Sequence, residues 1–227
     1  MTYDAVLFDH DGVLVSVFED DRRVPAFRRQ LLDAFQRDGL EPPDGTIIST
    51  LSHSVSYDKV LQFGEQLGLE PDQLWRYRDD TMADILTAAT RDGRKRPYDD
   101  VGALEGFEIP LGIASNNQRR VVEFVLDQYD LAHHFGAVHA RKPQLQSLRE
   151  KKPRPTYLER AMRDLDVTNP LYVGDRESDI VAGQRASVDT AFLRRTHNAG
   201  ASPGREPTYE VGGLDEVGAI LDGSRAE

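Results

Sequence analysis

Alternation of buried strands and amphipathic helices in the second half of the chain is the feature that most constrains the fold. Short apolar runs predict the strands, and apolar residues spaced three or four apart predict the helices. The predicted strands are 109–114, 137–138, 171–173 and 190–193, and the predicted helices are 117–129, 156–165, 177–185 and 214–221. Because parallel strands require long crossover connections, this order predicts an α/β fold, namely a Rossmann-like parallel sheet with helices on both faces.

An apolar run at Ala5–Phe8 predicts the first strand of that sheet, and two acids follow it directly. Asp9 and Asp11 flank His10, and Gly12 permits a sharp turn. Ligands of open α/β sheets bind beyond the carboxyl ends of the strands, so both acids are candidate functional residues. Side-chain alternation points His10 away from the acids, which favours a structural or supporting role. An ordinary acidic turn explains this stretch equally well by itself.

The segment between the first strand and the next one shows helical periodicity alone. The predicted helices are 24–35, 57–67 and one that begins at Pro71. An insertion of this kind is most simply an all-helical cap domain. We therefore expect a core domain formed by residues 1–14 and 98–227, and a helical cap domain formed by residues 15–97.

The 227 residues carry a formal net charge of −11, which argues against binding to nucleic acid. The absence of cysteine excludes disulfides and thiolate metal sites. No run approaches the ~20 apolar residues that a membrane span needs, and the N-terminus has no signal-peptide pattern. These observations predict a cytoplasmic protein that binds neither membranes nor nucleic acid.

Lysine is scarce, since 5 of the 28 basic residues are lysine and 23 are arginine. An acid excess with little lysine resembles the composition of proteins from halophilic archaea, in which a charged surface maintains solubility. Most carboxylates are therefore expected to serve solubility, and a functional assignment needs further support. The basic run at 91–96 is expected to be a solvated helix end.

Polar residues also follow other predicted strands. Ser115 and Asn116 end the second strand, and Asp175 and Asp179 follow the fourth. Because the carboxyl ends of parallel strands meet at one edge of a sheet, these side chains are expected to converge there with the acids of the first strand.

A lysine is expected at the same edge, and three candidates lie close together in the sequence. Lys142 is followed by a polar segment with no strand next, whereas Lys152 precedes the helix that leads into the strand bearing Asp175. Lys151 points the opposite way from its neighbour if the segment is extended. Lys152 is therefore the predicted site residue.

Four motifs thus follow one another along the chain, and they contain Asp9 and Asp11, Ser115, Lys152, and Asp175 and Asp179. Together they resemble the haloacid-dehalogenase superfamily, specifically its phosphatases with a helical cap inserted after the first motif. The motifs span the chain from Asp9 to Asp179 in a specific order and spacing, whereas the cap is matched only by position and helical content. Phosphoglycolate phosphatase-like enzymes are the nearest named relatives by this resemblance.

The resemblance implies that a carboxylate attacks phosphorus and forms an aspartyl-phosphate, which splits a slow hydrolysis into two steps. Asp9 would be this nucleophile, and Asp11 would be the general acid and base. A Mg²⁺ ion would be held by Asp9, Asp175 and the main-chain carbonyl of Asp11. Asp179 would be a further ligand or would orient the ligand waters.

The resemblance also assigns the binding of the phosphoryl group. Ser115 and nearby backbone N–H groups, including that of Asn116, would hold its oxygens, and Lys152 would neutralise its charge. The dehalogenases of the superfamily lack an acid two residues after the nucleophile, because a halide leaves without a proton. Asp11 therefore favours phosphoryl transfer over dehalogenation.

The expected function is thus Mg²⁺-dependent hydrolysis of a small phosphorylated metabolite. Two alternatives remain open, a phosphomutase of the β-phosphoglucomutase type and a binding module without turnover. Dependence on a bisphosphate activator distinguishes the mutase from the phosphatase. The identity of the metabolite and the oligomeric state are not readable from the sequence.

The acid excess predicts that salt stabilises the fold, because counterions screen the repulsion among surface carboxylates. The melting temperature, followed by circular dichroism, should rise as potassium chloride increases from low to molar concentration. A melting temperature that does not change with salt would contradict the halophilic interpretation of the composition.

Overall fold

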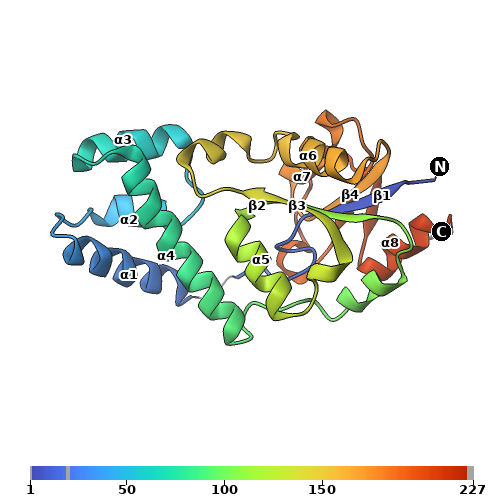
Figure 1. Ribbon diagram of the computed structural model, residues 1–227, viewed down its shortest axis with the longest axis horizontal. Helices are drawn as coiled ribbons and strands as arrows, with labels where there is room; N and C mark the ends of the chain where they lie inside the picture. Colours follow the sequence, from blue (N-terminus) through green and yellow to red (C-terminus); the bar gives the residue numbers. More distant parts are fainter. Residues whose placement is uncertain (1, 19–20, 224–227) are drawn as a thin grey trace. The chain divides into compact units, whose positions relative to one another are not determined.

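The computed structural model describes residues 2–18 and 21–223, and the chain forms two compact units (Figure 1). An α/β unit comprises 1–17, 95–141 and 150–227, and a helical unit comprises 18–94 and 142–149. The observed junctions lie three residues from those expected from the sequence. The helical unit also includes residues 142–149, which the sequence analysis assigned to the core domain.

The described residues of the α/β unit form a six-stranded sheet in the order β3-β2-β1-β4-β5-β6, and every pairing is parallel. The strands are β1 (Ala5–Phe8), β2 (Leu111–Gln118), β3 (Phe135–Arg141), β4 (Pro170–Gly174), β5 (Thr190–Leu193) and β6 (Tyr209–Val211). The chain order reverses at β1, between β2 and β4. Open α/β sheets bind ligands beyond the strand ends at such a point.

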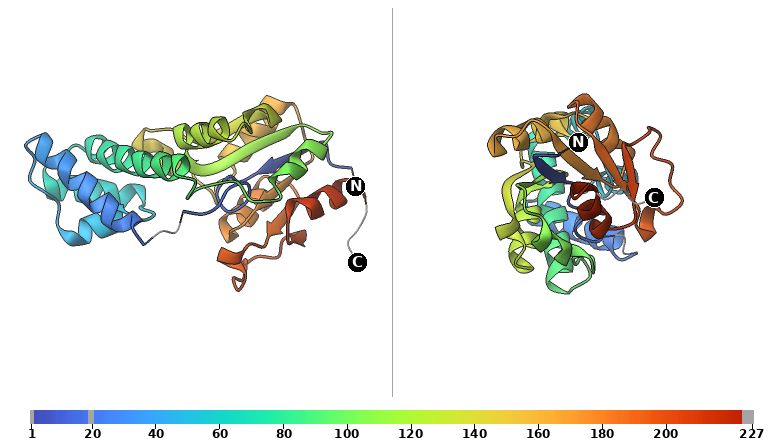
Figure 2. Two further views of the ribbon diagram at one scale, coloured as in Figure 1. Left: turned by 90° about the horizontal axis from the view of Figure 1, so that it is seen from below. Right: turned by 90° about the vertical axis from the view of Figure 1, so that its right-hand side faces the viewer.

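Helices cover both faces of this sheet, as the sequence predicts. The helices are α5 (Arg119–Gln128), α6 (Thr156–Leu165), α7 (Glu177–Arg185) and α8 (Leu214–Leu221). Helices α6 and α7 bury Leu158 and Ala182 against the sheet face that carries Leu7 and Tyr172. Figure 2 shows the chain from two further directions. Along the described ranges, no helix combines the length and apolar character that crossing a bilayer requires.

The segment after β5 returns to the sheet through a loop, and residues 199–207 have no helix or strand. A short 3₁₀ helix spans Thr196–Asn198, and Asn198 is buried. Strand β6 then pairs with β5 and was not predicted. With three residues, Tyr209–Val211 is too short to display the two-residue alternation that identifies a strand.

The helical unit has its own apolar core. Its helices are α1 (Arg23–Arg37), α2 (Gly45–Leu51), α3 (Tyr57–Leu67) and α4 (Pro71–Arg91). Leu31 of α1 and Trp75 of α4 are among the buried side chains, and Leu145 from the segment 142–149 joins them. The side chain of Asp44 accepts hydrogen bonds from the first turn of α2, which fixes where that helix begins.

Candidate active site

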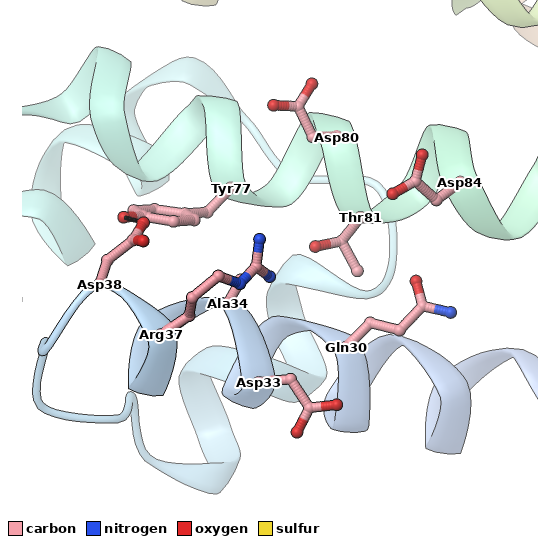
Figure 3. A pocket seen from close by; sticks show the side chains of 9 residues that line it. All are labelled: Gln30, Asp33, Ala34, Arg37, Asp38, Tyr77, Asp80, Thr81 and Asp84. Carbon is pink, nitrogen blue, oxygen red and sulfur yellow. Dashed lines mark hydrogen bonds between the residues drawn. The ribbon is translucent and has the colours of Figure 1, made fainter.

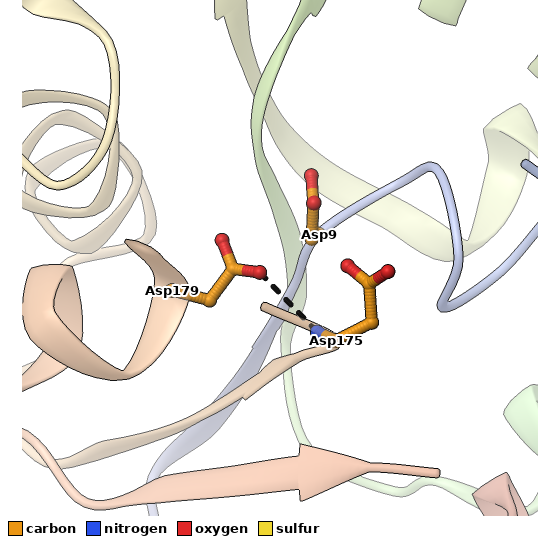
Figure 4. A group of neighbouring side chains, drawn as sticks. All are labelled: Asp9, Asp175 and Asp179. Atoms are coloured by element: carbon orange, nitrogen blue, oxygen red, sulfur yellow. Dashed lines mark hydrogen bonds between the residues drawn. The ribbon is translucent and has the colours of Figure 1, made fainter. Parts of the chain in front are cut away.

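Three carboxylates from the α/β unit meet beyond the strand ends. Asp9 follows β1, Asp175 follows β4, and Asp179 lies in the first turn of α7. One carboxylate oxygen from each lies within 4.8 Å of the others, and all three residues are buried. Figure 4 shows the three side chains extending toward a common space. Such a cluster of oxygen donors suits a hard divalent cation.

The pairing of β1 with β4 sets this convergence. Phe8 pairs with Val173, and the N–H of Asp9 donates to the Val173 carbonyl at 2.9 Å. The chain must then pass close to α7, and Gly174 makes this possible. A Cβ at Gly174 would lie 2.2 Å from the Cβ of Asp179. The glycine of the Gly-Asp pair therefore allows helix α7 to approach the strand end.

Lys152 lies among the acids. Its Nζ is 2.9 Å from Oδ1 of Asp9 and 2.6 Å from Oδ1 of Asp179. It also donates to the Tyr172 hydroxyl at 2.7 Å. The Asn116 side chain holds the Lys152 backbone, since its Oδ1 accepts from the Lys152 N–H at 2.7 Å and its Nδ2 donates to the Lys152 carbonyl at 3.1 Å. The Asn116 amide is thus engaged by the protein, which leaves any phosphate contact of this residue to its main chain.

The buried charges shift the pKa values of the acids in opposite directions. Burial alone would raise the pKa of Asp9, but Lys152, the His10 N–H and the Ser115 hydroxyl hold it below its ordinary value. Burial, followed by repulsion from Asp9 and Asp179, raises the pKa of Asp175 to about 8. The site thus carries more carboxylates than one lysine neutralises, and a divalent cation would supply the missing charge.

Asp179 differs from the other two acids in its hydrogen bonding. Its Oδ1 contacts Lys152, and its Oδ2 accepts from the N–H groups of Asp175 at 3.2 Å and Arg176 at 3.0 Å. By contrast, Oδ1 of Asp175 is buried and has no hydrogen-bond partner in the described part of the chain. The donor set therefore fits a metal bound directly by Asp9 and Asp175 and oriented by Asp179.

The side chain of Asp11 has partners outside the carboxylate cluster. Its Oδ1 pairs with the Lys95 ammonium, and its Oδ2 accepts from Nδ2 of Asn117 at 2.5 Å. Lys95 also donates to the Ser16 carbonyl at 3.2 Å and is 1% exposed. The sequence predicts a solvated helix end over 91–96, and this is wrong for Lys95, although its neighbours in that run are exposed. A lysine within a basic run carries no sequence signal of burial, because its partner lies 84 positions away.

His10 is fully buried beside the acids. Its Nδ1 lies 3.5 Å from Oδ1 of Asp11 without a hydrogen bond between them, and neither ring nitrogen has a hydrogen-bond partner in ranges 2–18 and 21–223. Burial, reinforced by the positive charge of Lys95, lowers the pKa of His10 to about 3. The ring is therefore neutral at physiological pH.

A hollow of about 520 Å³ in the helical unit lies between α1 and α4 (Figure 3). Asp33, Asp38, Asp80 and Asp84 line it together with one cation, Arg37. A phosphate dianion would be repelled by this lining. The hollow is thus unsuited to the phosphoryl group of a substrate.

Residues 6–193 match the family described as haloacid dehalogenase-like hydrolase. The chain belongs to this family. A pyrophosphatase PpaX from Oceanobacillus iheyensis is 30% identical over 128 residues, which are 51% of this chain and 58% of that protein. A phosphoglycolate phosphatase from Neisseria meningitidis is 35% identical over 106 residues, which are 43% of each protein. The matched part of this family member thus spans about half the length of these two curated relatives.

Solved structures of low sequence identity share the fold of this family member. The crystal structure of CbbY from Rhodobacter sphaeroides in complex with phosphate is similar with a TM-score of 0.67 at 18% identity. The likeness covers 97% of this chain and 100% of that chain. At this identity, the comparison shows a common fold.

The low pKa of His10 predicts that this residue destabilises the metal-free protein in mild acid, whereas the raised pKa of Asp175 acts in the opposite direction. Between pH 6.5 and about 3, the unfolded chain binds a proton at His10 that the folded chain lacks, so the contribution of His10 to the free energy of unfolding falls as pH falls. From pH 7 to pH 5, this contribution should lower the free energy of unfolding by about 2 kcal/mol. Urea denaturation in EDTA at both pH values measures it.

His10→Leu is the control for this measurement, because it keeps an apolar side chain of similar size and removes the titrating group. The Asp175 contribution is common to both proteins, so the free energy of unfolding of wild type minus that of His10→Leu should fall by about 2 kcal/mol from pH 7 to pH 5. A difference that does not change with pH would contradict the lowered pKa.

Proposed function

We propose that this protein is a Mg²⁺-dependent phosphatase that hydrolyses a small phosphorylated metabolite through an aspartyl-phosphate on Asp9. The observation that carries the proposal is the buried cluster of Asp9, Asp175 and Asp179 around the ammonium group of Lys152. Membership in a hydrolase family supports it. A non-catalytic binding module would not need a nucleophile whose pKa is held low.

Asp9 and Asp175 would hold Mg²⁺ together with the main-chain carbonyl of Asp11, and Asp179 would orient the ligand waters. When bound, the cation would reduce the repulsion between the Asp9 carboxylate and the phosphate dianion. Lys152 would bind the transferring phosphoryl group from another side, and Ser115 with the backbone N–H of Asn116 would contact its oxygens.

In the first half of the reaction, a carboxylate oxygen of Asp9 attacks phosphorus while the bond to the leaving oxygen breaks. Asp11 gives that oxygen its proton. In the second half, Asp11 takes a proton from water, the water oxygen attacks phosphorus, and the bond to Asp9 breaks. Lys95 and Asn117 both donate to the Asp11 side chain, and these contacts would hold it in place for both proton transfers.

The relatives suggest where a search for the substrate should begin. PpaX is named for pyrophosphate and the Neisseria enzyme for phosphoglycolate. Both compounds are small, strongly anionic phosphates. We therefore propose inorganic pyrophosphate and 2-phosphoglycolate as the first candidates, with phosphomutase activity as the alternative to be tested by adding a bisphosphate activator.

Asp9→Asn should abolish turnover while the fold is retained, because an amide neither attacks phosphorus nor binds Mg²⁺ as an anion. With p-nitrophenyl phosphate and Mg²⁺, kcat should fall on the order of 10⁴-fold or more. Asp164→Asn is a matched control, since Asp164 is an aspartate that pairs with His139 outside the site. Substantial Mg²⁺-dependent activity in Asp9→Asn would contradict the proposed nucleophile, and wild-type protein without activity would favour the binding module.

Asp11→Asn should separate substrates by their leaving groups. The p-nitrophenolate ion leaves without protonation, whereas the alkoxide of an aliphatic phosphate requires a proton. The ratio of kcat/KM for an aliphatic phosphate to that for p-nitrophenyl phosphate should therefore fall in the variant. An equal loss on both substrates would remove the general-acid assignment, since general damage to the site would explain it.

A further inference from the structure

A fifth segment of the α/β unit reaches the carboxylate cluster, beyond the four motifs that the sequence singled out. The chain leaves β5 and forms the 3₁₀ helix Thr196–Asn198 directly beside Asp175. Arg195 fixes the start of this segment, because its guanidinium donates to Asp100 at 2.8 Å and to the Val13 carbonyl at 2.9 Å. The segment is thus attached to the loop that follows Asp11.

This segment contacts both the side chain and the main chain of Asp175. Nε2 of His197 lies 2.7 Å from Oδ2 of Asp175. Nδ2 of Asn198 donates to the Asp175 carbonyl at 2.9 Å and to the Leu193 carbonyl at 3.0 Å. The carboxylate of Asp175 therefore has one oxygen that is held by the protein, while Oδ1 is buried with no hydrogen-bond partner among the described residues.

The chemistry of a metal-bound carboxylate fixes the direction of the His197–Asp175 hydrogen bond. An ionised carboxylate accepts hydrogen bonds and cannot donate, so Nε2 of His197 donates to Oδ2 when Asp175 is a metal ligand. In a neutral ring, Nδ1 is then the acceptor, and it faces the Tyr98 hydroxyl at 3.4 Å.

Gly12 provides the space for this pair. Its φ of +86° favours glycine, and a Cβ there would lie 2.1 Å from Oδ2 of Asp175 and 3.0 Å from Nε2 of His197. The glycine of the first motif thus serves a second purpose besides the turn. Any larger residue would displace the Asp175–His197 hydrogen bond.

We propose that His197 is a positioning residue for the metal site, which holds Oδ2 of Asp175 so that Oδ1 faces the cation. The inference rests on the proposed Mg²⁺ site of Asp9 and Asp175. A ligand that is fixed before binding loses less freedom when the metal arrives, and such supporting hydrogen bonds are worth about 10- to 100-fold in metal affinity or activity.

Calorimetric titration of the EDTA-treated, dialysed protein with MgCl₂ tests this inference. His197→Leu keeps an apolar side chain of similar bulk without a donor, whereas the Gln side chain of His197→Gln places an amide N–H near the position of Nε2. The Kd for Mg²⁺ should rise about 10- to 100-fold in His197→Leu and stay within about threefold of wild type in His197→Gln. His139→Ala is the matched control, since its His–Asp pair at 2.8 Å lies outside the site and its loss should leave the Kd unchanged.

A wild-type Kd in His197→Leu would overturn the inference, and so would equal weakening in His197→Leu and His197→Gln, because the donor would then not be the cause. The melting temperatures of the metal-free proteins separate a loss of fold from a loss of affinity. Failure of the proposed function has a different signature, namely a wild-type protein that binds no Mg²⁺ or an Asp175→Asn variant that binds it unchanged.

Discussion

The ammonium group of Lys152 is the interaction on which the site depends. It lies within 2.9 Å of Asp9 and 2.6 Å of Asp179, and all three groups are buried. Removing a charge from water costs several kcal/mol per ion unless a partner compensates for it. One lysine offsets only part of the charge of three carboxylates, and in the absence of a further cation the pKa of Asp175 rises to about 8. This excess of buried negative charge makes the cluster suitable for a divalent cation.

A second lysine separates the environments of the two acids in the first motif. Asp9 contacts Lys152 within the carboxylate cluster, whereas Asp11 contacts Lys95 and Asn117. Two carboxylates that lie two positions apart in the sequence thus have different partners. Such a separation is what distinct roles as nucleophile and as proton carrier require.

Much of the fold could be predicted because its signals are local. The run Ala5–Phe8 and the helix Thr156–Leu165 have the bounds that apolar periodicity indicates. The unpredicted parts lack such a signal. Strand β6 has three residues and depends on its pairing with β5. The segment 142–149 packs with the helical unit through Leu145, although the alternation of strands and helices around it predicts that it belongs to the core domain.

The sequence by itself determined that Asp9 and Asp175 stand at strand ends and that Lys152 precedes the helix leading into β4, which predicts that they gather at one edge of the sheet. Only the tertiary structure decided that Lys95 is buried against Asp11 and that His197 holds Asp175. The physical reason is that periodicity records which face of an element is apolar, and it carries no information about which side chain a distant loop delivers. Those pairings depend on the register of neighbouring strands and on close approaches that Gly12 and Gly174 permit.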